Sequence, residues 1–345
     1  MTRRAIAALI VMLALLAMTG CEPKLAPTIR PNSGDAYRVG VSVVHKLYLT
    51  IQDVERTQTV NINVDGDWRF TTVAKGHTAD LAFTLSSLSL RRASADGVLE
   101  YAVRTPPGDS ATVPSGYTRA FEQYPLTLRL GGAGALEMVE GAQPLLNALR
   151  AEPDLADRTD NGELDGELAK ILSDRALADT LGVMFDVLPP KKSRAGAEWD
   201  TTGEIYFELV PVTTRSRLSL RTLIGGQARV ETKTEYAGES SGGFGASNLR
   251  FGAGGIKGQG GGAVMISLDT GLATRADVSA EYRGEVSVYG NPHLNPNDFY
   301  PFRLERTISI HAVPVAMQIE KPKEKSESRR ANQGPDFSAP VPSDD

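Results

Sequence analysis

The chain has 345 residues, of which 37 are basic and 42 are acidic, so its formal net charge at pH 7 is −5. This balance argues against a nucleic-acid-binding surface, which requires clustered Lys and Arg side chains. The single cysteine excludes an internal disulfide, and the 4 histidines are scattered without the spacing of metal ligands.

The first twenty residues have the pattern of a bacterial export signal. Arg3 and Arg4 precede an apolar run from Ala5 to Ala17, which is too short to span a bilayer comfortably. Small residues then lead to Cys21, in a pattern that resembles the lipobox of bacterial lipoproteins. The resemblance implies removal of residues 1–20 and attachment of palmitate-type acyl chains to Cys21. The alternative is a plain secretory signal followed by an accidental cysteine.

The remaining chain divides into a tether, one folded domain and a tail. Residues 21–36 contain prolines and no periodicity, which is typical of a spacer. Alternating apolar residues predict strands through most of residues 37–315. Lysine, glutamate, serine and proline dominate residues 316–345, which are therefore predicted to be a disordered tail.

Glycine-containing turns separate the expected strands. Asp65-Gly66 and Asp96-Gly97 lie between alternating runs, and each predicts a tight hairpin. Gly225-Gly226 predicts a third turn, and a strand is expected over residues 204–212. Residues 238–262 are rich in glycine and lack apolar alternation, so we expect a flexible loop there.

One long segment, from Asp160 to Leu188, has a helical period. Asp160 or Asn161 can cap its start, and Pro189 and Pro190 prevent its continuation. A weaker helix is expected over residues 135–149. Strands on both sides of one amphipathic helix predict an α+β fold, in which a large antiparallel curved sheet or half-closed β-barrel holds the helix on its concave face. The helix places these apolar residues on one face: Leu164, Leu168, Ile171, Leu172, Leu181, Phe185 and Leu188.

Two resemblances arise from this pattern. Leu188-Pro189, Gly196, Trp199, the glycine-rich approach to Val264 and the turn at residues 268–271 resemble a family of uncharacterised bacterial lipoproteins with a domain of unknown function. That family implies no activity, cofactor or site residue. The order of strands, helix and strands also resembles the periplasmic lipoprotein-carrier fold.

The strongest catalytic candidate is Asp269, in the triplet Asp269-Thr270-Gly271. The triplet resembles the active-site loop of aspartic proteases, which need two carboxylates that share one proton. A second such triplet is absent from the sequence, so only a homodimeric enzyme would satisfy this chemistry. Because Asp-X-Gly is also an ordinary hairpin turn, we expect a non-catalytic protein.

Metal and nucleotide sites are not expected either. The acidic segment from Asp157 to Asp165 resembles a calcium loop, but Leu168 stands where such a loop has its bidentate glutamate. The glycine run from Gly258 to Ala263 precedes an expected strand, so it lacks the helix N-terminus that binds a pyrophosphate. We therefore expect no metal, no cofactor and no catalytic residue.

The expected function depends on the space between helix and sheet. The candidate ligand-binding residues are Leu168, Ile171, Leu172 and Leu181, on the apolar face of the helix. A cavity beside them would bind a lipid or other apolar ligand, whereas closed packing would indicate a structural or adaptor module of the cell envelope. The expected partners are the ligand and a membrane reached through Cys21, on the periplasmic side or at the outer membrane.

Overall fold

The computed structural model describes most of the chain between residues 23 and 315, and these residues belong to one compact unit. The predicted signal segment, Cys21, the acidic segment over 157–162 and the predicted tail over 316–345 lie outside the described residues. The described ranges are 23–73, 78–95, 97–104, 115–131, 134–152, 163–207, 210–238, 249–251, 255–288, 294–295 and 297–315.

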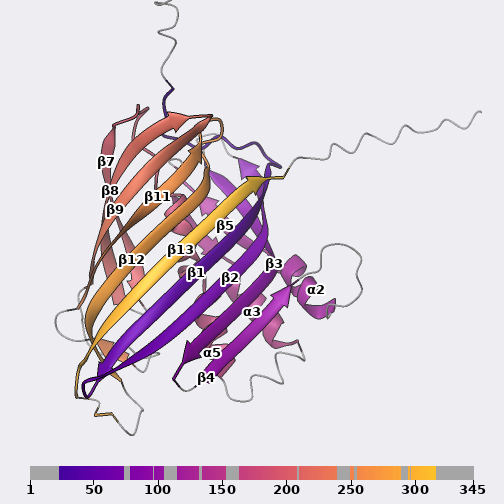
Figure 1. Ribbon diagram of the computed structural model, residues 1–345. Helices are drawn as coiled ribbons and strands as arrows, with labels where there is room; N and C mark the ends of the chain where they lie inside the picture. The colour runs from indigo at the N-terminus through magenta and orange to yellow at the C-terminus, as the bar shows by residue number, and fades with distance from the viewer. Residues whose placement is uncertain are drawn as a thin grey trace, which may run out of the picture. The chain divides into compact units, whose positions relative to one another are not determined.

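Among the described residues, 13 strands form one antiparallel sheet. Its order is β6-β5-β3-β2-β1-β13-β12-β11-β9-β8-β7, while β4 pairs with β3 and β10 pairs with β12 (Figure 1). In chain order the strands are β1 (Ala36–Ile51), β2 (Val54–Val73), β3 (Ala79–Ser94), β4 (Gly97–Arg104), β5 (Leu126–Leu130), β6 (Leu136–Glu140), β7 (Glu198–Phe207), β8 (Val210–Ile224), β9 (Gln227–Gly238), β10 (Leu249–Phe251), β11 (Ile256–Ser267), β12 (Ala273–Val288) and β13 (Tyr300–Pro314).

The predicted α+β fold with a central helix is wrong, because strands make up most of the described residues. The segment expected to be one helix contains α5 (Glu163–Ile171), α6 (Asp174–Leu181) and the 3₁₀ turn η2 (Gly182–Met184). Ser173 causes the break. Its backbone is extended, and its hydroxyl accepts a hydrogen bond from the Ala176 backbone N–H at 3.1 Å, so Ser173 caps the start of α6. The likeness to the lipoprotein-carrier fold rested on the order of strands, one helix and strands, and it is lost because the described elements do not follow that order.

The expected helix over residues 135–149 is also wrong in its first part. Strand β6 occupies residues 136–140, and Gly141, with φ of 104°, ends the strand before helix α3 (Ala142–Arg150) begins. The Ala142 backbone N–H donates to Asp174 Oδ1 of α6 at 2.9 Å, so α6 caps α3. A further helix, α2 (Ser115–Gln123), was not predicted.

The turn predictions had mixed outcomes. The hairpin expected at Asp65-Gly66 is wrong, because β2 continues through both residues, and only a register shift against β3 marks them. The chain turns instead at Gln52 and Asp53, whose φ angles of 49° and 63° form a two-residue hairpin turn without any glycine. The turn at Gly225-Gly226 is confirmed. The strand expected over residues 204–212 is wrong, because β7 ends at Phe207 and β8 starts at Val210.

The glycine-rich segment is not one flexible loop. Gly258, Gly260, Gly261 and Gly262 lie inside β11, which pairs with both β9 and β12. A Cβ atom on Gly260 would lie 2.6 Å from the Ser279 backbone oxygen, a distance too short for any real Cβ atom. These glycines therefore allow the backbones of adjacent strands to approach closely.

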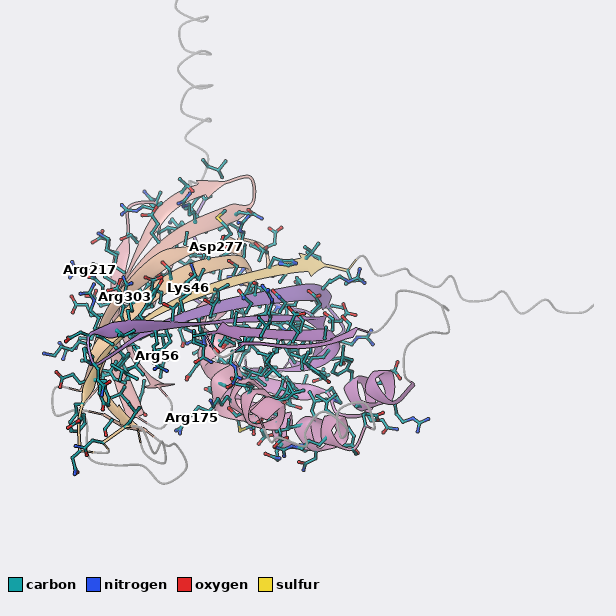
Figure 2. All side chains as sticks on the ribbon, turned by 60° about the horizontal axis from the view of Figure 1, so that its bottom comes forward. Lys46, Arg56, Arg175, Arg217, Asp277 and Arg303 are labelled. Carbon is teal, nitrogen blue, oxygen red and sulfur yellow. The ribbon has the colours of Figure 1, made fainter. Side chains whose placement is uncertain are left out.

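Helix α6 contacts both β6 and β7, which stand at opposite ends of the sheet order. The sheet therefore curves, so that one face, here called the inner face, looks toward the helices. Figure 2 shows Arg175 on the helix side, whereas Lys46 and Arg303 project from the other side of the sheet. Along β1 the side chains of Val39, Val41 and Val43 are buried, as alternation requires for an inner face.

Part of the predicted tether packs against the folded unit. Leu25 and Ile29 are buried in the main apolar core. The backbones of Leu25 and Ser193 exchange two hydrogen bonds of 2.9 and 3.0 Å, and the Arg30 N–H donates to the Thr270 oxygen at 2.6 Å. Leu25, Ile29 and Arg30 therefore tie this part of the chain to the folded unit.

This contact predicts that Ile29→Ala lowers the free energy of unfolding by about 2 to 5 kcal/mol, because it removes a buried side chain from the core. Lys24→Ala, which changes an exposed side chain of the same segment, should lower it by less than about 0.5 kcal/mol. Urea denaturation measures both values. Equal and negligible effects would mean that the segment is only a spacer.

Candidate functional site

The inner face leaves a cavity of about 530 Å³ between β1, β2 and the helices α5 and α6, here called the first cavity. The space is partly open to solvent, since the exposed side chain of Lys170 also lines it. Its walls are largely apolar and include Val41, Val43, Leu47, Leu49, Val60, Ile62, Val64, Phe302 and Leu304.

A second cavity of about 450 Å³ lies on the other side of α6, against β7, β8, β9 and β12. Asp179, Ile205, Tyr282 and Arg306 line both cavities. The two spaces are therefore neighbours that share a wall, and the groups in that wall face any molecule bound in either space.

A row of polar and small residues crosses the inner face at this wall, here called the polar row. On β1, β13 and β12, the inner rows on either side of the polar row are mainly apolar. One of these rows consists of Val43, Ile308 and Val278, and the other consists of Leu47, Leu304 and Tyr282. Strand register places the members of the polar row side by side, in the order His45, Arg306, Ala280, Gly260, Thr234, Ser216 and Thr201.

Arg306 is the charged member of the polar row. Its Nη2 donates to the Thr180 hydroxyl of α6 at 2.9 Å. Its Nε is buried and has no hydrogen-bond partner within the described part of the chain. None of the ion pairs found among the described residues includes Arg306. The side chain as a whole is partly buried, and a buried donor without a partner is unfavourable, so this position requires an explanation.

The imidazole and phenol groups near Arg306 are neutral near pH 7. Burial, with a smaller contribution from the positive charge of Arg306, lowers the pKa of His45 from 6.5 to about 3. Burial raises the pKa of Tyr282, whose ring centre lies 4.9 Å from that of Tyr236. The imidazole and both phenols therefore stay uncharged, and Arg306 carries the positive charge of this cluster.

The two cavities differ in the sign of the charge that surrounds them. Lys170, Arg175 and Arg306 line the first cavity together with Glu167 and Asp179, so basic groups exceed acidic ones by three to two. Glu167 is already paired with Arg92 at 3.3 Å and with Lys170 at 3.4 Å. The second cavity is lined by Arg306 and three acidic side chains, namely Asp179, Asp186 and Glu204. An anion is therefore better accommodated in the first cavity.

The structure brings together three of the four residues predicted to line a pocket. Ile171, Leu172 and Leu181 line the first cavity, whereas Leu168 is fully buried and packs in the core away from it. The prediction missed His45 and Arg306. The available sequence signal was a polar residue at an inward position of an alternating strand, but sequence alone does not reveal that the two are paired across β1 and β13.

The Asp269-Thr270-Gly271 triplet lies at a different place from both cavities. It forms the turn before β12, and Gly271, with φ of 71°, packs so closely on the Thr28 backbone that a Cβ atom would lie 2.6 Å from its oxygen. The turn therefore holds the N-terminal segment. The expectation that the protein is not an enzyme stays a prediction.

The described residues lack two further features, a membrane-spanning helix and a metal-binding cluster. No described helix combines the length and the apolar character needed to cross a membrane. Within the same residues, no group of three or more His, Cys, Asp or Glu side chains is placed to hold a metal ion.

Comparison with known proteins gives a family but no activity. The model described as "Family of unknown function (DUF6263)" matches residues 76–273. No curated protein matches the chain.

The solved structures show only weak likenesses. A lipovitellin structure, titled for its lipid–protein interactions, is 12% identical over 83% of this chain and 26% of that chain, with a TM-score of 0.39. An outer membrane channel from Pseudomonas putida F1 is 7% identical over 82% and 97% of the two chains, with a TM-score of 0.23. The chain spans about a quarter of the length of the lipovitellin chain. These scores are too low to carry an argument about function.

The lowered pKa of His45 predicts a specific sensitivity to acid. Between pH 6.5 and about 3 the native state binds fewer protons at His45 than the unfolded state, so stability falls as the pH falls through this window. From pH 7 to pH 5 the contribution is about 2 kcal/mol.

His45→Gln should therefore lose about 2 kcal/mol less stability than the wild type over that range. Urea denaturation at both pH values measures the difference, and His311→Gln, which changes an exposed histidine on the outer face, is the control. An identical acid response in wild type and His45→Gln would show that His45 titrates normally.

Proposed function

The chain belongs to the Family of unknown function (DUF6263), and we propose from its interior that it binds a lipid or other apolar ligand in the first cavity. The single observation that carries this proposal is the cavity of about 530 Å³ with largely apolar walls. Small-molecule sites typically occupy about 300 to 1,000 Å³ and are lined mainly by apolar side chains with a few polar groups. A purely structural or adaptor module of the cell envelope is the alternative, and it requires no such space.

Side chains from strands and from the helical segment both line this site. Val43 and Val60 come from the strands β1 and β2, while Leu172, which directly follows α5, and Leu181 of α6 line the same cavity. Burying the hydrocarbon part of a ligand among such side chains stabilises the complex by roughly 25 cal/mol for each Å² of apolar surface. Affinity therefore comes mainly from the apolar walls.

We also propose that acylated Cys21 holds the protein at a membrane of the bacterial envelope. The support is the sequence pattern before Cys21 together with the docking of Leu25 against Ser193. The four residue steps from Cys21 to Leu25 reach at most about 14 Å. The folded unit would then sit close to the bilayer surface, without a long spacer.

The anchor proposal predicts that Cys21→Ser moves the protein from the membrane fraction to the soluble fraction, or leaves its signal segment uncleaved. Fractionation of cells, followed by mass spectrometry of the N-terminus, measures this outcome. A variant that is cleaved and still fractionates with membranes would exclude Cys21 as the anchor.

The cavity proposal predicts saturable, one-site binding of the neutral apolar fluorophore N-phenyl-1-naphthylamine. Val43→Phe fills part of the first cavity and should weaken this binding by about tenfold or more, since one buried aromatic ring displaces the probe. Val44→Phe is the matched control, because its side chain projects from the opposite face of the same strand, and it should change the affinity less than about twofold.

Circular dichroism and thermal unfolding are used to check that both variants fold. If the wild type shows no saturable binding, or if folded Val43→Phe binds as well as the wild type, the first cavity is not a ligand site. The structural or adaptor alternative would then be favoured.

A further inference from the structure

Arg306, in the wall of the first cavity, indicates the head group of the ligand and not only its apolar character. The side chain is partly buried and hydrogen-bonds neutral groups: its Nη2 donates to Thr180, and it also bonds the Tyr282 hydroxyl. Its buried Nε remains without a partner among the described residues. Desolvating a guanidinium in this way is costly unless an anion or several acceptors satisfy it. An occupant that brings a negative charge would remove that cost.

The surroundings favour an anion over a neutral polar head. Arg306 is flanked across the sheet by neutral His45 and by Ala280, whose small side chain leaves space beside the guanidinium. Ser173, Thr180 and Tyr282 add hydroxyl groups to the lining of the first cavity. Hydroxyl donors beside the Arg306 guanidinium, in a lining with an excess of one positive charge, form a set that suits an acceptor with a single negative charge.

The geometry also discriminates between classes of anion. A guanidinium presents its donors in a planar fork that matches a carboxylate. The three basic and two acidic side chains of the lining leave an excess of one positive charge, which balances the single charge of a carboxylate. A phosphate monoester carries a charge of about −1.5 to −2 near neutral pH, which is larger than that excess. The cavity of about 530 Å³ is in the middle of the range for one small ligand, which favours a single chain over a lipid with several chains.

We infer that the ligand of the first cavity is a single-chain fatty acid, whose carboxylate binds Arg306 while its hydrocarbon chain lies against the apolar walls from β1 and β2. This inference rests on the proposed function, because it requires that the cavity binds an apolar molecule. It adds the chemical class of the head group and the residue that recognises it.

Competition with N-phenyl-1-naphthylamine tests the head group on the wild-type protein at pH 8, where the free acid is ionised. Dodecanoate, dodecanol and dodecyl phosphate have the same chain and differ only at the head. We expect dodecanoate to displace the probe at a concentration about 10- to 100-fold lower than dodecanol, since a hydrogen-bonded charge pair contributes that much. Dodecyl phosphate should be weaker than dodecanoate.

Two arginine variants then assign the effect to one side chain. Arg306→Met should weaken dodecanoate binding by about tenfold or more and change dodecanol binding by less than about threefold. Arg303→Met is the matched control, because Arg303 lies on the outer face of the same strand and pairs there with Glu305 at 3.3 Å. It should leave both affinities unchanged.

The outcomes separate this inference from the proposed function. If the probe and dodecanol bind but dodecanoate binds no better, the apolar site stands and the fatty-acid inference is overturned. If dodecyl phosphate binds best, the head group is a phosphate and the inference is likewise overturned. If neither the probe nor dodecanol binds, the proposed function itself fails. The wild-type head-group series decides the question even if Arg306→Met does not fold.

Discussion

The contact of α6 with both ends of the sheet is the constraint on which the interior depends. β6 and β7 lie at opposite ends of the strand order, and each contacts α6, so the sheet has to curve around the helices. Glycines inside β11 allow neighbouring backbones to approach closely enough for that curvature. Because α6 has only 8 residues, it covers part of the inner face, and the cavities lie on its two sides.

The register between strands determines which side chains face one another in that interior. A one-residue slip of β13 against β1 would turn Arg306 to the outer face and bring Glu305 or Thr307 inward. In the native register the apolar inner rows of both strands lie on either side of the polar row. They limit the contact of His45 and Arg306 with water, which keeps the imidazole neutral and strengthens any interaction of the guanidinium with an anion.

The sequence predicted local features well where the side-chain pattern and the backbone geometry agree. Alternating valines specify β1, and Gly225-Gly226 specifies a turn, because only glycine adopts positive φ there without strain. Prediction from the sequence failed where contacts between distant segments determine the local structure. Asp65-Gly66 continues as strand because β3 supplies a partner, and the glycines of β11 are strand residues because their neighbours lie close. The polar row was not predictable, since its members are up to 261 residues apart, from His45 to Arg306, and only the sheet order brings them together.

The N-terminal segment links the interior to the proposed anchor. Leu25 and Ile29 belong to the same apolar core as Val43 and Leu172, which line the first cavity. The Asp269-Thr270-Gly271 turn fixes this segment, so its glycine is explained by packing rather than by catalysis. With Cys21 acylated, the few residues before Leu25 would keep the folded unit within about 14 Å of the lipid surface. A fatty acid that leaves the bilayer would then meet the protein near the membrane, where the local concentration of such a poorly soluble molecule is highest.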